Sequence, residues 1–145
     1  MVPIGEGQWD VEVFGDVGRS LSMIPGYVNL NLGYRQRTLN HDFNFKPGDE
    51  FTLLAEGGWQ ATSYLMGKAS IRYLYSTHPQ ALGITFRTQR RELLTVAPAI
   101  LLTPGRSFTI EAGVQLPLRG QDIPAGPQFN IGFMYTFDLF RRGER

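Results

Sequence analysis

Residues 127–140 constrain the fold most strongly, because apolar and polar side chains alternate there without a break. The bulky apolar set is Phe129, Ile131, Phe133, Tyr135, Phe137 and Leu139, and the set between them is Asn130, Gly132, Met134, Thr136 and Asp138. Successive side chains of a β-strand point to opposite faces, so an extended strand gathers the whole apolar set on one side. That side must pack against a second layer or lie in lipid.

The same period of two recurs along the rest of the chain. It predicts strands at residues 8–20, 27–38, 50–62, 65–77, 91–103 and 107–118, in addition to the strand within 127–140. No window shows a sustained helical period of 3.6 residues. The sequence therefore predicts an all-β, antiparallel fold of about seven or eight strands.

The segment 78–90 decides between seven strands and eight. It is either a long loop that carries a strand extension or a short extra strand. We favour the loop, because Pro79 and Gly83 interrupt the alternation. In the strand that follows, Pro98 predicts a bulge or a locally unpaired position, since proline has no amide hydrogen to donate.

Two architectures fit this pattern: a soluble sandwich or barrel with its apolar faces inside, and a membrane barrel with its apolar faces in lipid. The polar faces distinguish them because they contain small residues among the charges, namely Gly18, Gly33, Gly58, Ala97, Ala99, Gly113 and Gly132. A sheet face in bulk water would instead be rich in Lys, Glu and Thr. Small residues between complementary charges suit a confined, hydrated lumen. We therefore expect a transmembrane β-barrel, either complete or part of a larger one.

The charged residues of the polar faces are expected to line this lumen. They are Asp10, Glu12, Asp16, Arg35, Arg37, Glu56, Lys68, Arg72 and Glu111. In a hairpin of the first two strands, the acids Asp10 and Glu12 lie opposite or diagonal to Arg35 and Arg37. The register of this hairpin could shift by two residues. The next hairpin would bring Arg72 close to Glu56.

Strand length and the connections agree with a membrane barrel. The predicted strands run to about 12 residues, close to the 9–11 that span a tilted bilayer. Aromatic residues occur near their ends, as interface girdles require: Trp9, Tyr34, Trp59, Tyr73, Tyr75, Phe108, Phe129, Tyr135 and Phe137. Short and long connections alternate, which predicts periplasmic turns and outer loops. An odd strand count would indicate a miscounted strand or the C-terminal part of a larger, even-stranded barrel.

Composition excludes several other classes of protein. The formal net charge is +1 and the basic residues are scattered among acids, so no nucleic-acid partner is expected. Without cysteine there is no disulfide framework and no thiolate metal site. No apolar run approaches the roughly 18 residues of a membrane helix. The N-terminus lacks the basic start and apolar core of a signal peptide, so an exported protein would be present in mature or truncated form.

Candidate chemistry is sparse. His41 and His78 fall in the long connections, but no Ser–His pair or carboxylate dyad has a diagnostic spacing. Asp42, Asp49 and Glu50 lie near His41 without the ligand spacing of a known cation-binding loop. We therefore predict no catalytic residues, no metal and no cofactor, and we do not expect an enzyme.

The last predicted strand carries a recognisable motif. Asn130-x-Gly132-x-x-Tyr135-x-Phe137 resembles the C-terminal assembly signal of bacterial outer-membrane barrels. The resemblance implies recognition by the barrel-assembly machinery. The polar tail 138–145 departs from that pattern, because the aromatic residue commonly closes the chain.

Four further segments carry a looser resemblance. They are G-Y-R-Q-R, K-P-G-D-E-F, E-L-L-T-V-A-P-A-I and E-A-G-V-Q-L-P-L-R-G-Q-D-I-P-A. They are similar to the C-terminal half of the outer-membrane transporter family associated with the meta-pathway of phenol degradation. The resemblance implies a larger, even-stranded barrel that passes small, often hydrophobic molecules.

These observations lead to one functional hypothesis with two alternatives. Residues 1–145 are interpreted as a single β-barrel domain, or a C-terminal barrel portion, in the bacterial outer membrane that acts as a passive channel or transporter. Its expected partners are the lipid bilayer, the barrel-assembly machinery and small-molecule solutes; the oligomeric state is left open. The alternatives are a non-conducting structural barrel or complex subunit, and a soluble lipocalin-like binder of small ligands.

Overall fold

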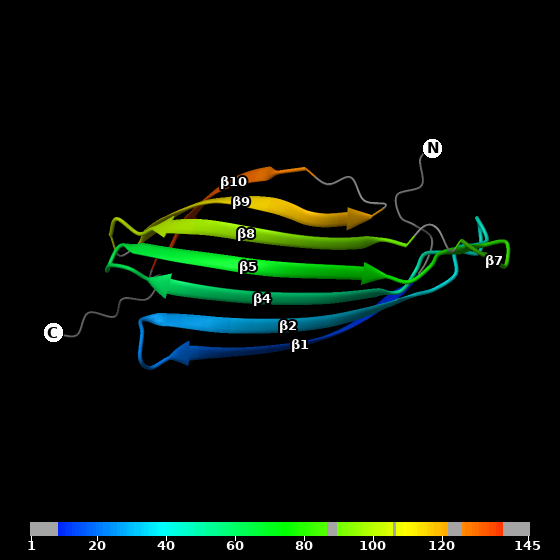
Figure 1. Ribbon diagram of the computed structural model, residues 1–145, viewed down its shortest axis with the longest axis horizontal. Coiled ribbons are helices and arrows are strands. Elements are labelled where there is room, and N and C mark those ends of the chain that lie inside the picture. The colour runs from blue at the N-terminus through cyan, green and yellow to red at the C-terminus, as the bar shows by residue number, and fades with distance from the viewer. Residues whose placement is uncertain (1–8, 87–89, 106, 122–125, 138–145) are drawn as a thin grey trace.

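The computed structural model describes residues 9–86, 90–105, 107–121 and 126–137. Their main feature is one antiparallel sheet of seven strands: β1 (Asp10–Leu21), β2 (Gly26–Arg37), β4 (Glu50–Gln60), β5 (Leu65–Ser76), β8 (Glu92–Leu102), β9 (Phe108–Gln121) and β10 (Gln128–Tyr135). The strands lie side by side in chain order, and β10 turns behind its predecessors (Figure 1). The predicted all-β, antiparallel fold is thus confirmed. No helix long and apolar enough to cross a membrane occurs in the described ranges.

A second, small sheet resolves the ambiguity of the 78–90 segment. It contains β3 (Phe45–Lys46), β6 (Gln80–Ala81) and β7 (Ile84–Thr85), in the order β3-β6-β7. Leu82 and Gly83 have positive φ angles of 51° and 77°, which two-residue hairpin turns require. Residues 80–85 therefore form a small hairpin within a connection, and the described part of the segment, 78–86 and 90, adds no strand to the main sheet. The segment thus contains short extra strands, the alternative that we did not favour, but they lie outside the main sheet.

The main sheet is open at both edges, and the strands that the structure describes form no closed barrel. Seven strands that alternate in direction leave β1 and β10 running the same way at opposite edges. Pairing them would require a parallel seam in an otherwise antiparallel sheet. The prediction of a barrel closed by this chain alone is therefore not met by the described strands, and the reason is their odd number.

The break in regularity predicted at Pro98 is only partly there. β8 has partners on β9 from Glu92 to Val96 and again from Ala99, so Pro98 lies in an interruption of the pairing on that side. The register shift itself lies between Leu94 and Thr95. β9 extends to Gln121, beyond the predicted end at residue 118, and the shift lets this longer strand stay paired with β8.

The two faces of the sheet differ in composition and in exposure. No hydrophobic side chain is buried among the residues with assigned burial, and Phe129 and Phe133 are 84% and 71% exposed. On the opposite face, the side chains of Arg37 and Glu50 are only 13% and 12% exposed. Charged side chains crowd together while apolar ones spread apart, as on the concave and convex sides of a curved sheet. This is the reverse of a soluble protein, where the apolar face is covered.

Tyr27 shows how tightly the charged face is packed. It lies directly opposite Gly58 in the pairing of β2 with β4, and its ring covers the space that a side chain at that position would fill. The methyl group of Met66 closes the same space. Gly67, one residue further along β5, has nothing within 4 Å of the place where a Cβ would stand. Position 58 is therefore tightly packed, whereas position 67 has room for a side chain.

We expect Gly58→Ala to lower the free energy of unfolding by about 1–3 kcal/mol, because the new methyl group overlaps the Tyr27 ring. Gly67→Ala is the matched control and should be neutral or stabilising by up to about 1 kcal/mol. Urea unfolding in detergent micelles, followed by circular dichroism, measures both. Equal midpoints for the two variants would contradict this packing.

Candidate functional site

The charged face begins with a five-residue network at the end of the sheet where the long connections lie. Glu12 is opposite Arg35, Asp10 is opposite Arg37, and Glu50 is opposite Arg35 from the other side. Arg35 Nη2 lies 2.8 Å from Glu12 Oε2, and Arg35 Nη1 lies 3.4 Å from Glu50 Oε2. Arg37 Nη2 lies 3.2 Å from Glu50 Oε1, and its Nε lies 3.6 Å from Asp10 Oδ2. We call this group the rim network.

Glu50 joins the two arginines, yet the sequence reasoning did not include it among the lumen-facing charges. It was considered only with the loop residues Asp42 and Asp49 as a potential cation ligand. Its alternation with Glu56 in β4 was the signal that places it on the charged face. Asp49 is used elsewhere, because its Oδ1 accepts the backbone N–H of Arg37 at 2.9 Å. No cluster of three or more potential metal ligands occurs in the part of the chain that the structure describes.

A second group of polar contacts lies nearer the short turns. Tyr27 donates its hydroxyl hydrogen to Glu56 Oε1 at 2.6 Å. Lys68 Nζ lies 3.0 Å from Glu111 Oε1 and reaches across the whole width of β8 to do so. Ala99 stands opposite Lys68 on the intervening strand, and its short side chain leaves the path clear. The small residues of this face therefore allow long charged side chains to pair across it.

The predicted proximity of Arg72 and Glu56 does not lead to an ion pair. The register sets Arg72 opposite Leu54, and Glu56 opposite Ser70, so the two charges are diagonal and Glu56 instead accepts the Tyr27 hydroxyl. Arg72 has no acidic partner within 4.0 Å among the residues described. It is an exposed cation on the central strand of the sheet.

Asp16 likewise has no cationic partner in the described ranges. Its Oδ2 accepts long hydrogen bonds of 3.4 Å from the side-chain amides of Asn29 and Asn31. Around Asp16 the charged face therefore presents side-chain amides, next to apolar residues such as Phe14 and Leu54, and it holds no ion pair among the described residues.

All nine charges predicted for the lumen lie on this one face of the sheet. With Glu50 added, the face carries six carboxylates and four cations within its strands. Ion pairs are concentrated toward the two ends, and the middle holds the unpaired Arg72. Such a face can orient water and dipolar solutes, and its ion pairs hold its charged side chains in fixed positions.

The residues of the assembly-signal motif are divided between the two faces. Asn130 and Gly132 pair with Gly113 and Glu111 on the charged side. Tyr135 lies on the apolar side, where its ring stacks with that of Phe137 at 6.3 Å between centroids. The tail 138–145 lies outside the described residues.

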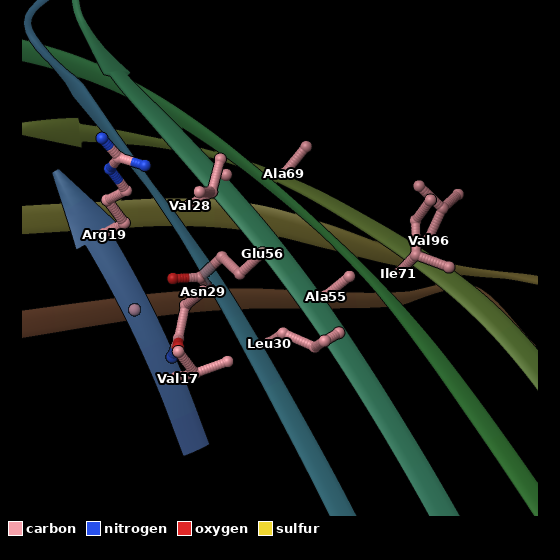
Figure 2. A pocket seen from close by; sticks show the side chains of 12 residues that line it. Val17, Arg19, Val28, Asn29, Leu30, Ala55, Glu56, Ala69, Ile71 and Val96 are labelled. Atoms are coloured by element: carbon pink, nitrogen blue, oxygen red, sulfur yellow. The ribbon is translucent and has the colours of Figure 1, made fainter. Parts of the chain in front are cut away.

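The apolar face has its own hollow, of about 560 Å³, shown in Figure 2. It forms because Ala55, Gly57 and Ala69 are small and lie between bulkier neighbours. Figure 2 shows Asn29 and Glu56 pointing away from it, toward the charged face. The hollow is open and almost wholly apolar, with Arg19 at its margin. It offers no converging polar groups to orient a ligand.

Comparison with known proteins assigns no family: no protein-family model, no curated protein and no solved structure matches the chain. A functional argument therefore has to start from the two faces of the sheet. The apolar face offers a hollow without converging polar groups, and the charged face offers fixed dipoles without a diagnostic catalytic arrangement.

We expect Glu50→Gln to lower the free energy of unfolding by about 1–3 kcal/mol, because it removes the carboxylate shared by two arginines in a largely covered position. Glu12→Gln is the matched control. Its side chain is 44% exposed, so the loss should stay below about 1 kcal/mol. Urea unfolding in detergent compares the two. A larger effect for Glu12→Gln would refute the central position of Glu50.

Proposed function

We propose that the seven strands are part of the wall of a transmembrane β-barrel in the bacterial outer membrane, and that the barrel is a passive channel for small polar molecules. One observation carries this proposal: the apolar face of long strands is exposed while the charged side chains are crowded together on the other face. Outer-membrane barrels have this arrangement, with apolar residues toward lipid and polar residues toward the lumen.

The free energy gained when apolar side chains leave water supports lipid as the environment of the apolar face. Each large apolar side chain that stays in water forgoes about 1.5–3 kcal/mol of burial. The face extends over all seven strands, and residues such as Val13, Ile71 and Ile131 are each more than half exposed. A bilayer covers such a surface along its whole length without a protein partner of matching shape.

The connections suggest an orientation. Short connections join β1 to β2, β4 to β5 and β8 to β9 at one end, while the longer ones carry the β3-β6-β7 sheet at the other (Figure 1). Bacterial barrels have short periplasmic turns and long outer loops. The rim network then lies at the outer mouth of the channel.

Closure of the barrel requires further strands. Because β1 and β10 run in the same direction, an antiparallel ring needs an odd number of additional strands between them. We propose that a longer chain or another subunit supplies them. The resemblance to the C-terminal half of the phenol-pathway transporter family agrees with a larger barrel.

The two alternatives differ in what they require of these faces. A non-conducting barrel is favoured by the extent of ion pairing, since paired charges can simply fill a closed interior. The unpaired Arg72 and the side-chain amides around Asp16 favour conduction. A lipocalin-like binder would need its apolar side chains to enclose a cavity, whereas here they are spread and exposed.

Neighbouring cysteines on β5 test the membrane placement, because the natural chain has no cysteine. We expect Ser70→Cys to react with a charged, membrane-impermeant maleimide after insertion into lipid vesicles, since position 70 faces the aqueous side. Ile71→Cys, on the lipid side, should react at least about tenfold more slowly, because thiolates form poorly without water. Detergent-unfolded samples of both variants control for intrinsic reactivity. Equal labelling in vesicles would refute the membrane placement.

Conduction is tested by the central cation of the charged face. Arg72→Glu should shift the reversal potential of single channels in a salt gradient toward cation selectivity, because it replaces an unpaired positive charge in the lumen. Arg19→Gln, an arginine on the apolar face, should leave selectivity unchanged. Planar-bilayer recording measures both. A closed and inserted barrel without conductance would favour the structural barrel.

A further inference from the structure

Near the margin of the apolar face, one carboxylate forms ion pairs with two arginines. Glu92 is the first residue of β8, and it lies opposite Tyr75 of β5 and Gln121 of β9. It belongs to the apolar side, because the Tyr73 hydroxyl donates to Glu92 Oε1 at 3.3 Å. Its side chain is nevertheless only 8% exposed. Glu92 is thus a covered charge at the end of the sheet where the long connections lie.

The arginines approach Glu92 from two directions. Arg90 Nη2 lies 3.3 Å from Glu92 Oε2, and the Arg90 guanidinium stands 5.5 Å from the centre of the Tyr75 ring. Arg119 Nη1, from β9, lies 3.6 Å from Glu92 Oε1. One carboxylate and two guanidinium groups leave a net charge of +1 at this position. We call Arg90, Glu92 and Arg119 the arginine clasp.

Most of the hydrogen-bond donors of the clasp remain available. A guanidinium group has five N–H donors, and Arg90 uses one of its nitrogens on Glu92. The ion-pair distance of Arg119 exceeds hydrogen-bond length, and its side chain is 66% exposed. Glu92 and Tyr75 therefore orient the two cations while their outer donors stay open to a ligand.

The surroundings indicate the class of ligand. Leu94 and Leu116 continue the apolar face from the clasp toward the middle of the sheet. Exposed guanidinium groups bind phosphate in a bidentate manner, and the neighbouring apolar surface favours acyl chains. A phosphate group with acyl chains can contact both the guanidinium groups and the neighbouring apolar surface, whereas a free anion contacts only the guanidinium groups.

We infer that the arginine clasp binds the phosphate group of a phosphorylated lipid whose acyl chains lie along the apolar face. The inference rests on the proposed membrane placement, which puts the clasp at the level of the outer headgroups. Arg119 supplies the more open guanidinium, Arg90 supplies the second one, and Glu92 keeps both in place.

The test uses the full chain in neutral detergent micelles, with diphosphoryl lipid A as the probe and native mass spectrometry as the readout. We expect the double variant Arg90→Gln/Arg119→Gln to bind the glycolipid at least roughly tenfold more weakly, because it loses a charge-assisted hydrogen bond to the phosphate group. Arg19→Gln is the matched control, because it removes an arginine from the apolar face near the short turns. It should bind like the unaltered protein.

Three comparisons decide the outcome. The same glycolipid without phosphate should bind the unaltered protein and the double variant equally. Equal retention of the phosphorylated form by both proteins would overturn the inference, and so would displacement of the lipid by inorganic phosphate at equal concentration. Labelling of Ser70→Cys and Ile71→Cys in vesicles reports on membrane placement separately, so a failed clasp and a failed membrane assignment give different results.

Discussion

In an antiparallel ladder, directly opposed residues share a face, so one hydrogen-bonded register fixes the composition of both surfaces. A slip of one residue in any of the six pairings of the main sheet would mix charges into the apolar side. The actual register sets Glu12 against Arg35, and Val13 against Tyr34 one step later. This alternation keeps most charged side chains on one surface, and the exceptions on the apolar side are Arg19, Glu92 and Arg119.

As an open sheet, the described strands leave apolar surface and two strand edges uncovered. Large side chains such as Phe129 stand free on one surface, and both edge strands present unpaired backbone groups. A bilayer would cover the first, but only further strands can satisfy the second, since hydrocarbon offers no hydrogen bonds. The same physical requirement therefore links the apolar surface to the need for a closed ring.

Much of the fold follows from local pattern. Alternation located all seven long strands, but Pro79 and Gly83 did not exclude short strands, since β6 and β7 form there outside the main sheet. In the first hairpin, the pattern placed the acids opposite or diagonal to Arg35 and Arg37 in a register that could shift by two residues, and the structure sets Glu12 opposite Arg35. Glu50 was placed at the start of the strand 50–62 but was considered only as a potential cation ligand with the neighbouring loop residues, although its alternation with Glu56 was visible. Arg72 was assigned a partner that the register places diagonally.

The sequence by itself determined which residues share a surface, since a period of two is a property of the extended backbone and needs no tertiary information. Only the tertiary structure decided which charges meet. Lys68 reaches Glu111 across an entire strand, and Arg119 reaches Glu92 from β9. Such contacts depend on register, on the shift between Leu94 and Thr95, and on small residues that leave long side chains room to extend. None of these distances is encoded within a single strand, because each arises from how several strands are aligned.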